Sequence, residues 1–194
     1  MARPTAADHD DKAAAVLEAA GRVFAERGYE GATMADVARA AGFSKAGVYH
    51  YYGSKEHLLH GLLRTSLEQV LADLSQADPG HEVDPAERMS LLVQAYVRSF
   101  ISRLRVVTPL LLRLELLRPE WRQEVKDLER HIVARFADAA SAVNRSVSPR
   151  TTAYLILGAA NWTYYWYDPD GDLSADDLAS SAAALFTSPV RRPG

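Results

Sequence analysis

Apolar residues recur at intervals of three and four along almost the whole chain, which is the period of an amphipathic α-helix and not of a β-strand. The first such stripe starts after Lys12 and ends at Arg27 and Gly28, a cation followed by a residue that tolerates positive φ. Its members are Ala13, Val16, Leu17, Ala20, Val23 and Phe24. No segment alternates between apolar and polar residues. The pattern predicts an all-α fold of about nine helices.

A second helix is expected after Thr33, because Thr33 and Asp36 have the spacing of a capping box. It ends at Gly42. Ser44 is the expected N-cap of a third helix, from Lys45 to about Tyr51. Seven residues do not form a stable helix alone, so Val48 and Phe43 are expected to anchor it. A long helix follows from Lys55, with a stripe of leucines and valines at Leu58, Leu59, Leu62, Leu63, Leu67, Val70, Leu71 and Leu74.

The C-terminal part has a recurrent signal for helix starts, a capping side chain placed before a proline. It occurs at Asp84-Pro85, Thr108-Pro109 and Ser148-Pro149, with a weaker form at Arg118-Pro119, and Ser174 to Asp177 is a further capping box. We therefore expect a flexible tail (1–11), a DNA-binding domain (12–56), a ligand-binding and dimerisation domain (57–187) and a C-terminal tail (188–194). The first domain contains three helices and the second is also helical.

Composition restricts the functional classes. With 194 residues, a net charge of −3 and no cysteine, the chain has neither a disulfide scaffold nor a cysteine nucleophile. Its start contains no apolar leader, and the longest uncharged run, residues 151–167, is too short for the roughly 20 apolar residues of a membrane span. We expect a cytoplasmic protein that makes no membrane contact.

Two helices joined by a tight turn with a glycine are typical of a helix-turn-helix, whose second helix enters the major groove of DNA. With Val48 inward, helical geometry places Ala46 and His50 on the opposite face, with Gly47 and Tyr49 on the flanks. Residues 1–60 contain seven Lys/Arg and eight Asp/Glu, so non-specific DNA affinity should be modest. If His50 and His57 protonate at a phosphate surface, DNA binding gains at mildly acidic pH.

The stretch from Val16 to Leu63, VLEAAGRVFAERGYEGATMADVARAAGFSKAGVYHYYGSKEHLLHGLL, resembles the DNA-binding region of the TetR family of transcriptional regulators. The resemblance lies in Phe24, Gly28, Tyr29, Thr33, Ala38, Gly42, Ser44, Tyr49, Tyr51, Ser54, Lys55 and Leu58. It implies phosphate contacts by Thr33, Lys45, Tyr49, Tyr51 and Lys55, and base contacts by Ser44, Lys45, Ala46, Gly47 and His50. It also implies a homodimer on a near-palindromic operator of double-stranded DNA, with the last two helices forming the dimer interface.

The C-terminal half suggests a hydrophobic inducer. Residues 98–122 contain six Arg and two Glu interleaved with leucines, which is either a solvated face or an apolar tunnel with a basic mouth. The pattern formed by Gly158, Asn161, Trp162, Trp166, Tyr167, Gly171, Leu173 and Ser174 is similar to that of a TetR branch that controls fatty-acid or steroid breakdown and responds to acyl-CoA thioesters. We expect the ligand-binding residues to be Phe100, Leu104, Leu111, Leu114, Trp121, Asn161, Trp162 and Tyr165.

Other chemistries have little support in the sequence. His57 and His60 have the spacing of two metal ligands, but a surface face of the long helix explains them better. No nucleophile elbow or phosphate-binding loop occurs, so we expect no catalytic residue, no metal and no cofactor. We expect a ligand-responsive repressor. The alternative is a helical sensor or carrier of acyl thioesters or other hydrophobic ligands that does not bind DNA.

Overall fold

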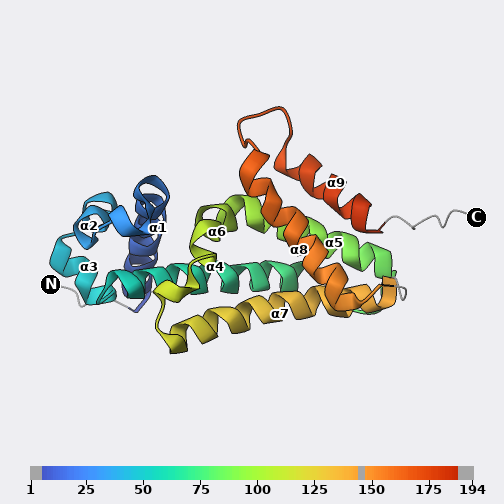
Figure 1. Ribbon diagram of the computed structural model, residues 1–194, viewed down its shortest axis with the longest axis horizontal. Coiled ribbons are helices and arrows are strands. Elements are labelled where there is room, and N and C mark those ends of the chain that lie inside the picture. Colours follow the sequence, from blue (N-terminus) through green and yellow to red (C-terminus); the bar gives the residue numbers. More distant parts are fainter. Residues whose placement is uncertain (1–5, 144–146, 188–194) are drawn as a thin grey trace, which may run out of the picture. The chain divides into compact units, whose positions relative to one another are not determined.

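The computed structural model describes residues 6–143 and 147–187, and these residues form nine α-helices and no strand (Figure 1). The helices are α1 Ala6–Gly31, α2 Met34–Ala41, α3 Lys45–Tyr51, α4 Lys55–Ala77, α5 Pro85–Ser99, α6 Arg105–Leu111, α7 Pro119–Val143, α8 Pro149–Trp166 and α9 Ala175–Thr187. The all-α prediction is confirmed. None of the described helices is long and apolar enough to cross a membrane. The expected tails at 1–5 and 188–194 lie outside the described residues.

The chain divides into two compact units. The N-terminal unit contains the residues up to Ser66 together with Val106–Val125. The C-terminal unit contains Leu67–Arg105 and the residues from Lys126 onward. The N-terminal unit therefore extends past residue 56, where the DNA-binding domain was expected to end, and includes the first half of α4 and the start of α7.

Helix α1 begins earlier than the apolar stripe indicates. Residues 6–11, assigned to the tail from the sequence, are helical. Asp10 and Asp11 lie in its second turn and are exposed. The expected stop is confirmed, because Gly28 has φ 69° and ψ 162° and breaks the helix before its last turn.

The core of the N-terminal unit joins α1, α2 and α3 to the start of α4. Val16, Val37, Val48, Leu58 and Leu59 are fully buried, one or two from each of these helices. Helix α2 packs against both α1 and α3. The seven-residue α3 is thus held by tertiary contacts, as its length requires.

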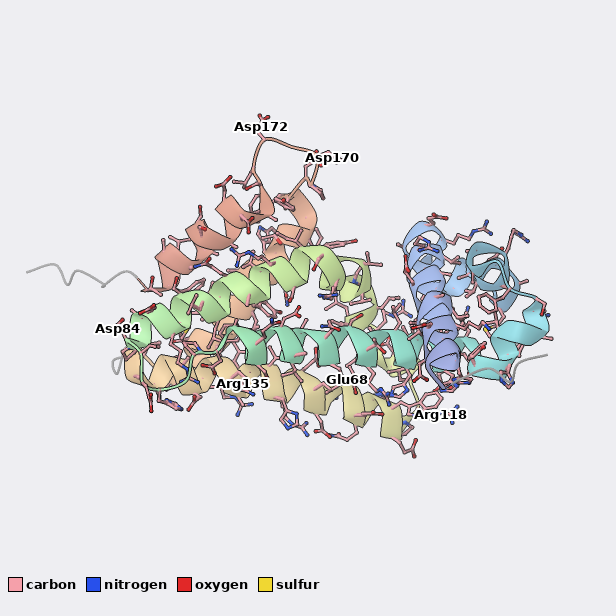
Figure 2. All side chains as sticks on the ribbon, turned by 180° about the vertical axis from the view of Figure 1, so that it is seen from behind. Glu68, Asp84, Arg118, Arg135, Asp170 and Asp172 are labelled. Atoms are coloured by element: carbon pink, nitrogen blue, oxygen red, sulfur yellow. The ribbon has the colours of Figure 1, made fainter. Side chains whose placement is uncertain are left out.

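The C-terminal unit is built around α5, which packs against α8 and α9. Helices α8 and α9 run antiparallel and are joined by a loop over residues 167–174 (Figure 1). Asp170 and Asp172 lie at the tip of this loop (Figure 2). The backbone N–H of Asp170 donates to Asp168 Oδ1, which forms a turn. The backbone N–H of Asp177 donates to Ser174 Oγ, so the expected cap of α9 is confirmed.

One expected helix start is wrong. Pro109 lies inside α6 and does not begin a helix. The chain leaves α5 through a π-helical turn, Phe100–Leu104, and continues into α6 without a break, so the helix is already established before Pro109. The starts at Pro85 and Pro149 are confirmed. Asp84 (Figure 2) accepts from the amides of Ala86 and Glu87, whereas the side chain of Ser148 makes no capping hydrogen bond.

A buried ion pair closes the loop between α4 and α5. The guanidinium of Arg88 donates to both oxygens of Asp78 at 2.7 and 2.8 Å, and it lies 2.9 Å from Asp138 on α7. Arg135, labelled in Figure 2, approaches Asp78 at 3.5 Å. The hydrogen bonds from Arg88 lower the pKa of Asp78 to about 2. Both partners of the pair are almost completely buried.

Asp78→Asn is expected to lower the free energy of unfolding by about 3 kcal/mol, because it breaks a buried charge pair. In the wild type, the contribution of Asp78 to the free energy of unfolding should be complete above about pH 4 and decline toward pH 2, since the pKa of Asp78 is lower in the folded chain. Urea denaturation at several pH values measures both effects. The control Asp170→Asn, in the exposed loop, should change stability by less than about 0.5 kcal/mol. Equal stability of the two variants would contradict this role.

Candidate DNA-binding site

A reciprocal cap fixes the start of α2. The amide of Asp36 donates to Thr33 Oγ1 at 3.2 Å, and the amide of Thr33 donates to Asp36 Oδ2 at 3.1 Å. Arg27 and Arg39 lie 3.0 and 3.3 Å from Asp36 Oδ1. The hydrogen bond from the Thr33 hydroxyl, followed by these two cations, lowers the pKa of Asp36. The capping box expected from the sequence is confirmed.

Helix α3 has the cap and the inward anchor that its sequence predicts. Gly42 ends α2 with φ 71°, and Ser44 Oγ accepts from the amide of Gly47 at 3.0 Å. Val48 is fully buried, whereas Ala46 and His50 are exposed. Helix α3 therefore presents a face that is small at its start and aromatic toward its end.

Gly47 has a structural reason to lack a side chain. A Cβ at this position would lie 3.3 Å from Ser44 Oγ and 3.5 Å from the ring of Phe43. A larger residue at 47 would disturb the cap as well as any approach to DNA. Ala46, which is exposed, is therefore the cleaner position for a steric test of recognition.

The ammonium group of Lys55 is occupied inside the protein. Its Nζ donates to the carbonyls of Tyr29, Glu30 and Ala32 at 2.7, 3.3 and 3.1 Å. It also lies 4.4 Å from the centre of the Tyr29 ring. These carbonyls belong to the end of α1 and the residues after it, so Lys55 joins the end of α1 to the start of α4.

The tyrosines of α3 have different surroundings. Tyr49 is 44% exposed, with the ammonium of Lys45 6.0 Å from its ring centre. Tyr51 is half-buried, and its ring lies 5.2 Å from His50 and 6.2 Å from Phe43. Tyr49 and Lys45 are thus the freer pair on the outer surface, and Tyr51 is partly engaged in packing.

The arginine-rich segment is bound within the chain. Arg113 forms ion pairs with Glu115 and Glu30. Arg118, labelled in Figure 2, donates two hydrogen bonds to the carboxylate of Glu56 at 3.2 and 3.1 Å.

The remaining arginines of this segment are also engaged. Arg122 donates to the carbonyls of the turn between α6 and α7. Arg98 lies 2.6 Å from Asp176, and Arg103 lies 3.4 Å from Asp73. The side chain of Arg105 lies outside the described residues. The described arginines of residues 98–122 therefore form intramolecular ion pairs and hydrogen bonds.

Trp121 at the start of α7 stacks on two histidines of α4. Its ring lies 5.2 Å from that of His57 and 4.7 Å from that of His60. His60 is buried and its Nε2 lies 2.7 Å from Glu124 Oε2. The expectation of a surface face is therefore wrong for His60. No local pattern in the sequence signals this pairing, because the partners are more than 60 residues apart.

The predicted ligand residues fall into both units. Leu111, Leu114 and Trp121 are half-buried in the N-terminal unit. Their surroundings include the turn held by Arg122 and the histidines stacked on Trp121. Among the described residues, no group of three or more His, Cys, Asp or Glu side chains has the arrangement of a metal site.

The other predicted ligand residues belong to the C-terminal unit. Phe100 is fully buried, and Asn161 accepts from the hydroxyl of the buried Tyr96 at 3.1 Å. Trp162 and Tyr165 are 63% and 66% exposed, with ring centres 4.9 Å apart. The side chain of Leu104 lies outside the described residues. The structure thus brings Trp162 and Tyr165 together on an exposed face, while Phe100 lies in the core.

Both halves of the chain are similar in sequence to known bacterial regulators. Residues 16–62 match the profile of the bacterial regulatory proteins of the tetR family, and residues 82–190 match the Tetracyclin repressor-like C-terminal domain. The uncharacterized HTH-type transcriptional regulator YfiR of Bacillus subtilis (strain 168) is 34% identical over 122 residues. This match spans 60% of the chain and 56% of YfiR, little more than half of that relative.

Solved structures match over nearly the whole chain. The TetR family regulator PfmR from Thermus thermophilus has a TM-score of 0.80 and 29% identity, covering 91% of this chain and 99% of PfmR. AibR, crystallised with isovaleryl coenzyme A and operator DNA, has a TM-score of 0.77 and 27% identity, covering 91% and 98%. Since the C-terminal profile alone matches more than half of the chain and the N-terminal profile covers α3, the chain belongs to the TetR family of bacterial transcriptional regulators.

Proposed function

We propose that this regulator is a repressor that binds a near-palindromic operator as a homodimer and is released by a hydrophobic inducer. The observation that carries this proposal is the exposed face of α3, which is held rigidly by the Ser44 cap and by buried Val48. A helix that is fixed from behind and small in front can approach base edges closely.

DNA contact is assigned to the outer surface of α2 and α3. Ser44, Ala46, Gly47 and His50 face the bases, and Thr33, Lys45, Tyr49 and Tyr51 contact phosphates. Lys55 has a different part in this proposal, because three carbonyls already bind its ammonium. It holds the end of α1 against the start of α4, and so supports the site from within.

Dimerisation is assigned to the open face of α8 and α9. On α8, Tyr154, Leu155, Trp162, Tyr165 and Trp166 are exposed, and on α9 Leu185 is 79% exposed. The opposite face of each helix is buried in the chain's own core through Ile156, Ala160, Leu178 and Ala179. An apolar face of this extent is typical of an interface. The TetR architecture supports a second copy of this chain as its partner.

The inducer is assigned to the C-terminal unit, with Phe100, Asn161, Trp162 and Tyr165 as its contacts, because Leu111, Leu114 and Trp121 belong to the other unit. Asn161 and Tyr96 provide a polar pair beside buried apolar residues, which suits a largely apolar ligand with one polar group. Trp162 and Tyr165 are exposed in the single chain, so a partner subunit would have to cover them. The likeness to AibR, crystallised with isovaleryl coenzyme A, supports an acyl-CoA as the ligand class.

An alternative function is favoured by one feature of the sequence, the slight acidic excess of residues 1–60. In this alternative the protein senses or carries hydrophobic ligands and does not bind DNA. Selection of binding sequences from random duplex DNA separates the two functions. A repressor should enrich a near-palindrome, whereas a carrier should enrich nothing.

The selected duplex should bind the wild type tightly and Ala46→Leu at least about 100-fold more weakly, because an added side chain blocks approach to the bases. Lys45→Ala should lower the slope of log affinity against log salt by about one, and Lys55→Ala should leave this slope unchanged. Titration by fluorescence anisotropy at several salt concentrations measures all three. If Ala46→Leu binds as tightly as the wild type and Lys55→Ala has a reduced slope, the assignment of DNA contacts to α2 and α3 is wrong.

Leu155→Asp is expected to convert the dimer into monomers at micromolar concentration, because it places a charge in the apolar interface. Light scattering coupled to gel filtration measures the mass. Leu112→Asp is the matched control, since Leu112 is 73% exposed and lies outside α8 and α9. This control should remain a dimer. A monomeric wild type, or a dimeric Leu155→Asp variant, would contradict the assigned interface.

The inducer class can be tested on a preformed complex with the selected duplex. Long-chain acyl-CoAs, free fatty acids and neutral hydrophobic drugs are added separately, and release of the labelled DNA is measured. The acyl-CoAs are expected to release DNA. An inducer that favours the non-binding conformation ~100-fold weakens operator affinity by at most the same factor. Release by neutral compounds alone would contradict an acyl-CoA inducer.

A further inference from the structure

We propose that His57 is a positioning residue whose neutral imidazole holds the turn between α3 and α4 in its DNA-binding geometry, and that acidification weakens operator binding by protonating it. This inference rests on the proposed DNA-binding function. It concerns a residue of α4 whose side chain packs against Trp121.

The turn between α3 and α4 depends on His57 for one of its hydrogen bonds. The backbone N–H of Gly53 donates to His57 Nδ1 at 3.3 Å. The backbone N–H of His57 in turn donates to Ser54 Oγ at 3.0 Å, which caps the start of α4. A ring nitrogen accepts a hydrogen bond only when it carries no proton. The Gly53 contact therefore requires the neutral tautomer with its proton on Nε2.

Trp121 fixes the plane of the His57 ring. The two rings are nearly parallel, with an interplanar angle of 19°. The guanidinium of Arg118 lies 3.7 Å from the centre of the Trp121 ring, and the amide of Arg118 donates to Glu56 Oε1 at 2.6 Å. The start of α7 thereby holds the ring that completes the α3–α4 turn.

The charges around His57 oppose its protonation. Burial has the largest effect and lowers the pKa of His57, and the positive groups of His60, Arg118 and Arg64 lower it further. Glu56 acts in the opposite direction. The Tyr52 ring lies 5.2 Å away, and Glu124 is engaged by His60 and Arg64.

The sign of the pH effect follows from this direction. The folded state disfavours the charged ring. The contribution of His57 to the stability of the α3–α4 turn is therefore complete above its ordinary pKa of 6.5, and it is lost as the pH falls below that value. Protonation also removes the acceptor for the Gly53 amide. The sequence alone suggests that protonated His57 strengthens DNA binding, and the surroundings of the ring argue for the opposite sign. His50 is exposed on α3, and the expectation from the sequence still applies to it.

The test compares operator affinity at about pH 8 and about pH 5.5, at constant salt, for the wild type and His57→Asn. The side-chain oxygen of Asn can replace Nδ1 as an acceptor and does not titrate. Wild-type affinity is expected to fall roughly three- to tenfold at the lower pH, whereas that of His57→Asn should change less than about twofold. The duplex is the one selected from random DNA.

Two matched variants test the contributions of His131 and His50. His131→Asn changes an exposed histidine of α7 in the C-terminal unit, and it should behave like the wild type. His50→Asn removes the exposed histidine of α3, and its loss of affinity on acidification should equal or exceed that of the wild type. An acid-induced gain in the wild type, or an equal loss in His57→Asn, would overturn the inference.

A second readout does not depend on DNA or on the folding of a variant. The titration midpoint of His57 in the wild-type protein is measured from its ring proton by NMR, and the signal is assigned through its contact with the stacked Trp121 ring. A midpoint below 6.5 supports the inference, and a midpoint at or above 6.5 overturns it. If the wild type selects no DNA at any pH, the proposed function fails, while this titration still decides the state of His57.

Discussion

A helix of seven residues has too few internal hydrogen bonds to remain folded alone, so the position of α3 must be imposed from outside. Val48 supplies the buried anchor, and Ser44 supplies the cap. Lys55 binds the carbonyls at the end of α1 and so fixes the start of α4 beside it. Val48 lies behind the helix and Ser44 lies at its start. The front is therefore left to small and polar residues without loss of rigidity.

Like Lys55, charged side chains elsewhere in the chain bind other groups of the protein itself. The arginines between residues 98 and 122 stand out in an acidic protein, yet the described ones bind carboxylates or carbonyls of the protein itself. Asp36 likewise combines a helix cap with two arginines. Such contacts restrict the freedom of side chains and elements, and residues 1–60 contain one more acidic residue than basic residues. Operator affinity is then expected to depend on the fit of α3 more than on a strong electrostatic field.

The sequence predicts those parts of the structure that depend on neighbouring residues. The caps at Thr33 and Ser44 and the stop at Gly42 act over three or four positions, and each is confirmed. Contacts between distant residues leave no such signal. Lys55 binds a carbonyl 26 residues away, and Arg118 binds Glu56 across 62 residues. The helix start expected at Pro109 is wrong because the π-helical turn that carries the chain into α6 has no distinctive residue pattern.

The central claim is that α3 reads DNA because the contacts behind it hold it in place. Amide hydrogen exchange of the protein with and without the selected duplex tests this claim most directly, since it reports on each segment separately. The account predicts that DNA slows exchange in Lys45–Tyr51 and in the turn at Gly53, with little change in the loop over residues 167–174. Unchanged exchange in Lys45–Tyr51 on a duplex that the protein binds would contradict it.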